Sequence, residues 1–388
     1  MKNRLTKFLA LTALLLGSTA TAFAQEIQKT NISTIFEIQQ YNRAIHIMAM
    51  LLIGFGFLMV FIKKYGRSAL TATFLLVSIS IPLYFLIHTS GIFGHAKGEI
   101  EELILAEFGA ASLLIAAGAV LGRLKMFQYI ILGLVFIPFY MLNEWIIIED
   151  GFGIIKDGFA DTGGSIVIHA YGALFGLAVA LSMTTKEDLI KPIEADATSD
   201  RYSILGSMVL WVFWPSFCAA LVPPEAIPHT VVNVFLALCG STLITYILSI
   251  AIKGKINIAY IANAALAGGV AIGSTCDHAS HSVAFIIGIL AGTISTIGFA
   301  MIQHRQQKLI KSVDTCGVTN LHGLPGLLGG FSAIPIVSGL NVSSQLSGIL
   351  ITIVSSLIFG FLTGKLISLF GHRKEAYHDA EEFEEVEA

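Results

Sequence analysis

The chain has 388 residues, of which 55% are hydrophobic and 13% charged, and its net charge is -3. Soluble domains carry about 25% charged residues, so this composition excludes a soluble protein and indicates an integral membrane protein. The mean hydropathy of +0.79 agrees with that interpretation. The apolar residues form runs of about 20 rather than short alternating segments, which excludes an outer-membrane barrel and predicts an all-α fold.

Several classes of function are excluded by missing motifs. The four cysteines lie at positions 218, 239, 276 and 316 without metal-ligand spacing, so we expect no metal, no cofactor and no disulfide framework. No basic stripe indicates nucleic acid as a partner. The chain also lacks HExxH, GxSxG and P-loop motifs, so we do not expect an enzyme.

The chain begins with a basic and then apolar stretch, residues 1–24, which ends in Ala22-Phe23-Ala24. This pattern is typical of a cleaved signal peptide, so the mature amino terminus should start outside the cell membrane. Eleven apolar segments follow, each long enough to cross a hydrocarbon core of about 30 Å. They fall at about 42–62, 68–88, 103–122, 127–149, 162–183, 202–222, 230–252, 257–276, 282–302, 314–339 and 345–370.

The distribution of charge tests this topology. Of the 23 basic residues, three lie in the signal peptide, sixteen fall on the predicted inner side and four on the outer side. Because cytoplasmic loops are enriched in Lys and Arg, this supports an outside amino terminus, a cytoplasmic carboxyl terminus and insertion in the inner (cell) membrane. The outer loops are acidic, which indicates either ordinary solvation or a mouth that enriches cations. The acidic tail, 371–388, should be either disordered or a cytosolic contact segment.

One motif occurs twice. Segments 161–169 and 314–322 share the pattern Asp-Thr-x-Gly-x-x-x-x-His, and each opens an apolar span. Because these are the fifth and tenth spans, and five is odd, the two halves must have opposite orientations in the membrane. The sequence therefore predicts a five-plus-five inverted repeat, with halves at about 41–183 and 202–339, followed by one extra helix at about 345–370.

The repeat brings two histidines to the same depth. At 1.5 Å per helical residue, His169 and His322 lie about 12 Å inside their aspartates, so both approach the membrane midplane from opposite sides. If one imidazole donates to the other, the remaining nitrogens can line a path as one donor and one acceptor. Asp161 and Asp314 open helices and should mainly cap them, although Asp161 could also favour a cation near the entrance.

Across the whole mature chain, these residues resemble the ammonium transporter and Rhesus protein family, in particular its Rhesus branch. The matching segments, besides the doubled motif, are Gly54-Phe55-Gly56-Phe57-Leu58-Met59, Asn143-Glu144, Trp214-Pro215-Ser216-Phe217, Asn263-Ala264-Ala265-Leu266-Ala267-Gly268-Gly269-Val270 and Asn320-Leu321-His322-Gly323. The resemblance implies a homotrimer embedded in membrane lipid, in which each subunit of eleven helices (residues 25–370) encloses its own pore. It also implies that His169 and His322 line the pore and that Phe108 and Phe217 stack to close its outer end.

The function that this resemblance implies is conduction of ammonia. Ammonium would be recruited at the outer mouth and lose a proton, and neutral ammonia would then pass the phenylalanines and histidines. A charge at the bilayer centre costs at least about 2.5–3.5 kcal/mol, which neutral ammonia avoids. Alternatives are an electrogenic ammonium transporter, a carbon dioxide channel and an ammonium sensor.

Four positions bear on the details of this pathway. Trp145 does not match the vestibule tryptophan of the ammonium-transporter branch, which favours a low-affinity, bidirectional channel because a cation–π site is missing. Cys218 and Thr319 replace an Asn and a His that are frequent in the Rhesus pattern. The intramembrane carboxyls of Glu107 and Glu144 either hold helices together or assist proton exchange.

Overall fold

The computed structural model describes residues 34–94, 97–156 and 158–383. The predicted signal peptide and the last residues of the acidic tail lie outside these ranges. Helices are the only regular elements within them, which confirms the predicted all-α fold. The α-helices are α2 (Gly56–Leu58), α3 (Gly66–Thr89), α4 (Glu99–Ala119), α5 (Met126–Ile148), α6 (Tyr171–Met183), α7 (Ala197–Cys218), α8 (Ile227–Lys253), α9 (Ile258–Ala264), α10 (Ala267–Ile272), α11 (His281–Ile297), α12 (Gln303–Ile310), α13 (Leu324–Ile336) and α14 (Val342–Ser368).

Shorter π-helical and 3-10 segments join several of these helices into longer spans. The π-helical segments are Met50–Phe55, Ser165–Ala170, Gly298–Ile302 and Thr319–Gly323, and the 3-10 segments are Met59–Phe61, Gly151–Gly153, Gly273–Thr275 and Asp379–Glu381. Among the described residues, nine continuous helical stretches are long and apolar enough to cross a membrane. They coincide with nine of the eleven predicted spans.

The other two predicted spans are also helical but more polar. The span at 202–222 corresponds to α7, whose first turn is capped by the Asp196 carboxylate, which accepts from Thr198 N at 2.9 Å and Ser199 N at 2.8 Å. The backbone N–H of Ser199 is the main reason that the pKa of Asp196 lies below its ordinary value. The span at 314–339 corresponds to Thr319–Gly323 with α13, and it contains Asn320 and His322. The total of eleven crossings stays a prediction.

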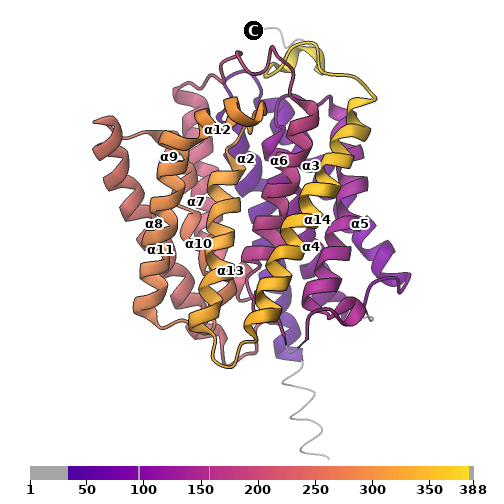
Figure 1. The fold of residues 1–388 in the computed structure, drawn as a ribbon, viewed down its shortest axis with the longest axis vertical. Coiled ribbons are helices and arrows are strands. Elements are labelled where there is room, and N and C mark those ends of the chain that lie inside the picture. Colours follow the sequence, from indigo (N-terminus) through magenta and orange to yellow (C-terminus); the bar gives the residue numbers. More distant parts are fainter. Residues whose placement is uncertain (1–33, 95–96, 157, 384–388) are drawn as a thin grey trace, which may run out of the picture.

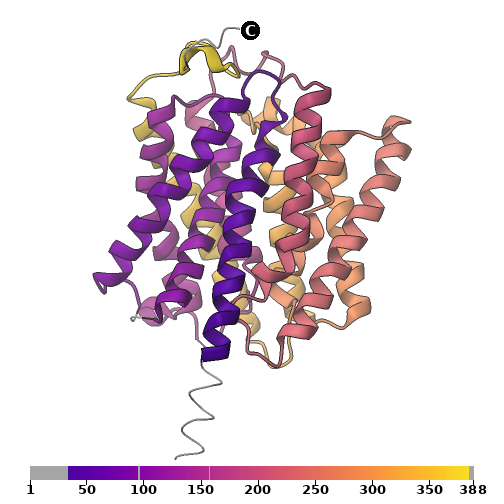
Figure 2. The ribbon, with the colours of Figure 1, turned by 180° about the vertical axis from the view of Figure 1, so that it is seen from behind.

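The bundle has a central helix surrounded by peripheral ones. In the most apolar window of α4, 89% of the residues are buried, against 33% in α3, α8 and α14. Figure 1 shows α14 crossing the front of the bundle, and Figure 2 shows the first helix, Thr34–Phe61 in indigo, running along the opposite face. The central position of α4 makes it a shared wall for the elements on both sides.

Glycine allows α4 and α6 to approach closely. A Cβ atom added at Gly172 would lie 2.5 Å from the carbonyl oxygen of Ser112, and one added at Gly176 would lie 2.5 Å from that of Ala116. Small residues at such contacts let helix backbones pack in a membrane, where the hydrophobic effect does not drive association. These glycines therefore fix the distance between the central helix and the helix that follows His169.

Part of the carboxyl-terminal tail packs against one end of the bundle, seen at the top of Figure 1. The guanidinium of Arg373, whose side chain is 1% exposed, donates to Leu124 O at 3.2 Å and pairs with Glu382 at 3.5 Å. Tyr377 N donates to Gly122 O at 3.0 Å. Residues 371–383 thus contact this same chain, and a cytosolic contact role for the tail stays a prediction.

The tail also caps two helices from a great distance in sequence. Asp379 accepts from Ser68 N at 2.9 Å and Arg67 N at 3.1 Å, at the start of α3. Glu382 accepts from Met126 N, the first residue of α5, at 3.0 Å. Carboxylates satisfy the free N–H groups of a helix start and interact favourably with its dipole. The tail therefore completes the ends of two membrane helices.

We expect Asp379→Ala to lower the free energy of unfolding by about 1 kcal/mol, the usual cost of losing a helix cap. Asp379→Asn retains one acceptor oxygen and should lose less. Reversible denaturation of the purified protein in detergent measures both differences. Equal stability of the wild type and the alanine variant would show that the cap does not stabilise the fold.

Candidate functional site

The two predicted histidines meet in the interior of the bundle. The Nδ1 atoms of His169 and His322 are 3.2 Å apart, and the ring centroids are 5.2 Å apart with an interplanar angle of 14°. The residues are 2% and 3% exposed. The expected hydrogen bond between the rings is therefore present, in a buried environment where each ring depends on the other for a polar partner.

Each histidine lies in a π-helical segment rather than an α-helix. His169 belongs to Ser165–Ala170 and His322 to Thr319–Gly323. Such short π-helical turns interrupt the regular ladder of hydrogen bonds and often occur at functional sites. The spacing from aspartate to histidine, converted with a regular helical rise, gives no sign of these π-helical turns in either half.

Asp161 caps the first of these segments. Its Oδ1 accepts from Ile166 N at 3.1 Å and from the hydroxyl of Ser274 at 2.5 Å, while its Oδ2 accepts from Val167 N at 2.8 Å. Asp314 repeats the arrangement, because its two oxygens accept from Val318 N and Thr319 N, both at 2.9 Å. Both carboxylates are thus engaged with backbone N–H groups that open the π-helical segments.

The shared glycine of the motif also has a structural reason. Gly164 and Gly317 both adopt left-handed backbone conformations, with φ angles of 73° and 68°. Side chains are strained in this region, whereas glycine enters it freely. In each copy, the left-handed glycine turns the chain between the capping aspartate and the segment that carries the histidine.

The two motifs enter the bundle from opposite ends. Next to Asp161, Ala160 N donates to the side chain of Gln345 at the start of α14, at 2.9 Å. Next to Asp314, Val313 O accepts from Arg123, which lies just beyond the end of α4. Close to Arg123 in the chain, Gln128 donates to Gly371 O, which lies beyond the other end of α14. Because α14 has 27 residues, these two ends are about 40 Å apart.

Aromatic rings extend the histidine pair on both sides. The ring of Trp214 stacks on His169 with centroids 5.5 Å apart, and the ring of Phe55 lies 6.2 Å from that of His322. Neither was named as a site residue from the sequence, although both lie in segments that carried the family resemblance. Their contact with the histidines could not be read from spacing because it joins distant segments.

Phe108 and Phe217 also lie together, on the Trp214 side of the pair. Their centroids are 4.6 Å apart with an interplanar angle of 51°, so the rings are in contact but tilted instead of stacked. The ring of Phe217 lies 6.1 Å from His169. The structure therefore brings both phenylalanines and both histidines into one continuous aromatic column.

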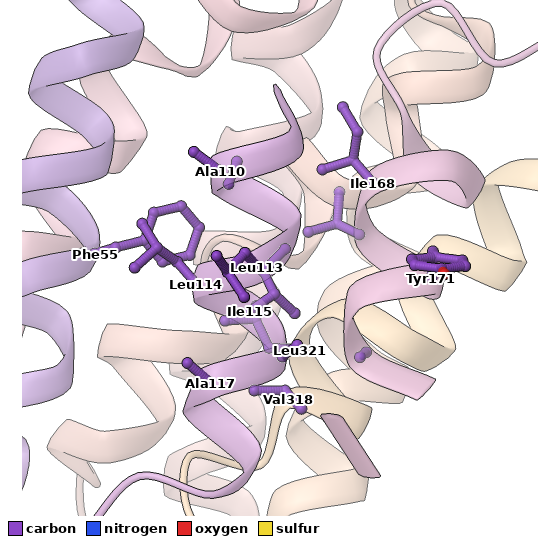
Figure 3. Close-up of a cluster of buried hydrophobic side chains, with 14 of the residues drawn as sticks. Phe55, Ala110, Leu113, Leu114, Ile115, Ala117, Ile168, Tyr171, Val318 and Leu321 are labelled. Atoms are coloured by element: carbon purple, nitrogen blue, oxygen red, sulfur yellow. The ribbon is translucent and has the colours of Figure 1, made fainter. Parts of the chain in front are cut away.

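A small cavity lies on the other side of His322. Its volume is about 20 Å³, which holds roughly one water-sized molecule. The lining is apolar apart from His322, Asn263 and Cys316. Figure 3 shows Phe55, Leu114, Ile115, Val318 and Leu321 from this lining among the buried side chains of the region.

The two intramembrane glutamates differ in their contacts. Glu144 accepts from the hydroxyls of Tyr84 at 2.7 Å and Tyr140 at 3.1 Å, so it links α3 and α5. Glu107 is 1% exposed, and its Oε2 has no hydrogen-bond partner among the described residues. The helix-holding role considered for both residues therefore has supporting contacts only at Glu144.

Three positions depart from the family pattern, and their surroundings differ. The ring of Trp145 contacts those of Phe93 and Phe152, with centroids 5.7 Å and 4.7 Å away. Cys218 is buried, and Thr319 N is one of the groups bound by Asp314.

Within the described ranges, no group of three or more His, Cys, Asp or Glu side chains could hold a metal ion.

We expect Asp161→Ala to destabilise the protein by at least about 2 kcal/mol, because it leaves several buried donors without an acceptor. Asp314→Ala should have a similar effect through Val318 and Thr319. Thermal unfolding in detergent measures both, with Asp150→Asn as the control, since Asp150 is exposed and its positive φ suits asparagine. Unchanged thermal stability of both alanine variants would contradict the capping role.

The sequence has extensive relatives. The pattern of the Ammonium Transporter Family matches residues 8–387. Ammonium transporter Rh type A of Canis lupus familiaris is 34% identical over 329 residues, which cover 82% of this chain and 77% of that protein. Ammonium transporter Rh type B of Homo sapiens is 37% identical over 302 residues, which cover 75% and 64%.

Solved structures share the fold. The structure of Nitrosomonas europaea Rh50 matches with a TM-score of 0.89 and 54% identity over 92% of this chain and 94% of that chain. A sensor Amt protein matches with a TM-score of 0.76 at 19% identity over 87% and 94%, which shows similarity of fold alone. The family comprises multi-pass membrane transporters and channels, not enzymes. This chain belongs to the ammonium transporter family, in its Rhesus-type branch.

Proposed function

We propose that this protein is a channel that conducts neutral ammonia through the interior of each subunit. The observation that carries the proposal is the hydrogen bond between the buried imidazoles of His169 and His322. This pair lies between the rings of Phe108 and Phe217 and a cavity for about one water-sized molecule. Ammonia is of that size and both donates and accepts hydrogen bonds. A pathway with few polar groups, each neutral, fits such a solute better than it fits an ion.

The hydrogen bond between the histidines determines which donor and acceptor atoms they present to the solute. When one neutral ring donates from Nδ1, its Nε2 is an acceptor, and the ring that accepts at Nδ1 carries its proton on Nε2. The pair therefore presents one acceptor and one donor. His169 Nε2 has no hydrogen-bond partner among the described residues, so it is free to meet the solute.

The tilted rings of Phe108 and Phe217 form the proposed outer gate. Ammonium would be recruited at the acidic outer mouth. It would leave its proton outside the gate, because an ion at the bilayer centre costs at least about 2.5–3.5 kcal/mol. Asp161 and Asp314 hold the histidine segments in place from the two ends.

Low affinity and conduction in both directions form part of the proposal. Trp145 is engaged by Phe93 and Phe152, so it does not supply an aromatic surface for a cation–π site at the mouth. We also propose a homotrimer in the inner membrane with eleven crossings, an inverted repeat and a cleaved amino-terminal leader. Exposed apolar side chains on α7 and α8, such as Met208, Val212, Leu243 and Ile247, provide surface for other subunits and for lipid.

We expect His169→Ala to reduce ammonia conduction roughly tenfold, the effect of losing about 1.4 kcal/mol of hydrogen bonding, within the usual range for buried bonds. Stopped-flow measurement of internal pH in proteoliposomes after an ammonium jump gives the rate. His304→Ala, at an exposed position on α12, is the matched control and should behave as the wild type. A rate for His169→Ala equal to that of the wild type would remove the support for this pathway.

The same proteoliposomes separate the main alternatives. On a solid-supported membrane, an electrogenic ammonium transporter gives a sustained current after an ammonium jump, whereas passage of neutral ammonia does not. A carbon dioxide jump tests the second gas directly through internal acidification. The proposal requires ammonia-driven alkalinisation above that of protein-free liposomes.

A further inference from the structure

Glu107 is a buried carboxyl that the fold does not use. Three other buried carboxyls are engaged, because Glu144 is bound by two tyrosines, and Asp161 and Asp314 are bound by backbone N–H groups. Glu107 is 1% exposed and its Oε2 has no partner in the described part of the chain. Buried polar atoms are nearly always satisfied, so an unsatisfied one in a membrane span calls for a functional reason.

The position of Glu107 relates it to the proposed pathway. It directly precedes the gate residue Phe108 on α4, so the two lie within about 1.5 Å of each other along the helix axis. Glu107 also shares a helix face with Leu114 and Gly118, seven and eleven residues further on, which line the cavity below His322. It therefore lies at gate depth on the face of α4 that borders the pathway.

The chemistry of this carboxyl is that of a neutral group. An ionised carboxylate without a cation or donors is very costly in an apolar environment, so the protonated acid is the form whose burial costs least. A protonated carboxyl has one O–H donor and a carbonyl acceptor. This is the same pair of functions that the two histidines supply together, beyond the contacting rings of Phe108 and Phe217.

We infer that the neutral carboxyl of Glu107 forms a second polar subsite, which hydrogen-bonds ammonia, or another small neutral solute with both donor and acceptor capacity, at the level of the phenylalanine gate. The inference rests on the proposed ammonia pathway. The subsite gives the solute a polar partner after it has left water and before it reaches His169. It would shorten the stretch in which a desolvated molecule has only apolar contacts.

Two substitutions separate this role from its alternatives. Glu107→Gln keeps one donor and one acceptor at nearly the same volume, and Glu107→Met keeps the length but removes both. We expect the Gln variant to conduct ammonia within about twofold of the wild type and the Met variant to conduct roughly tenfold more slowly. Thermal stability of the Met variant should not fall, because the unsatisfied polar group is gone.

The measurement is ammonia-driven pH relaxation in proteoliposomes, with Glu107→Leu as a second apolar variant if Met does not yield folded protein. Glu187→Met, which replaces an exposed carboxylate at the Arg123 end of the bundle, is the control. A Met variant that conducts like the wild type overturns the inference, as does a Gln variant as slow as Met, which would indicate proton acceptance instead. A Met variant that loses both stability and conduction also overturns it, in favour of a structural role. If the wild type itself does not exceed protein-free liposomes, the proposed channel function fails, whatever the variants do.

Discussion

The hydrogen bond between His169 and His322 imposes the main constraint on this structure. Two imidazoles with Nδ1 atoms 3.2 Å apart must be delivered by chain segments that enter from opposite ends of the bundle. An error of one helical residue in either segment would move a ring by about 1.5 Å along the axis and by about 100° around it. The residues that open each segment therefore have to fix both its start and its rotation.

The doubled motif meets this constraint with the same parts at both ends. An aspartate binds the free N–H groups of the segment, a left-handed glycine reverses the chain, and a π-helical turn alters the rotation before the histidine. Close contacts of Gly172 and Gly176 with α4 then set the distance of the first histidine segment from the central helix. The polar residues that open each segment thus serve mainly to position it, and of the residues in the doubled motif the two histidines are the ones that contact each other.

Much of this arrangement could be predicted from the sequence, and the features that could not be predicted have one cause in common. Hydropathy located nine of the helices, and the spacing from aspartate to histidine predicted that His169 and His322 would meet. The π-helical turns, the tilt of Phe108 on Phe217 and the contact of Trp214 with His169 depend on packing between segments far apart in the chain, for which local spacing has no signal. For the same reason, the sequence does not distinguish Glu107 from Glu144. In the fold, Glu144 accepts hydrogen bonds from tyrosine hydroxyls, whereas Glu107 Oε2 has no partner among the described residues.

The distribution of buried carboxyls also bears on selectivity. The carboxylate oxygens of Asp161, Asp314 and Glu144 accept hydrogen bonds from backbone N–H groups or from serine and tyrosine hydroxyls. A sodium or potassium ion that loses its water needs several oxygen ligands in return, and these oxygens are already committed. The pair of imidazoles and the unsatisfied carboxyl of Glu107 can each donate or accept a hydrogen bond without a net charge. The pathway that we propose favours a small neutral solute because it offers hydrogen bonds where an ion would need compensating charge.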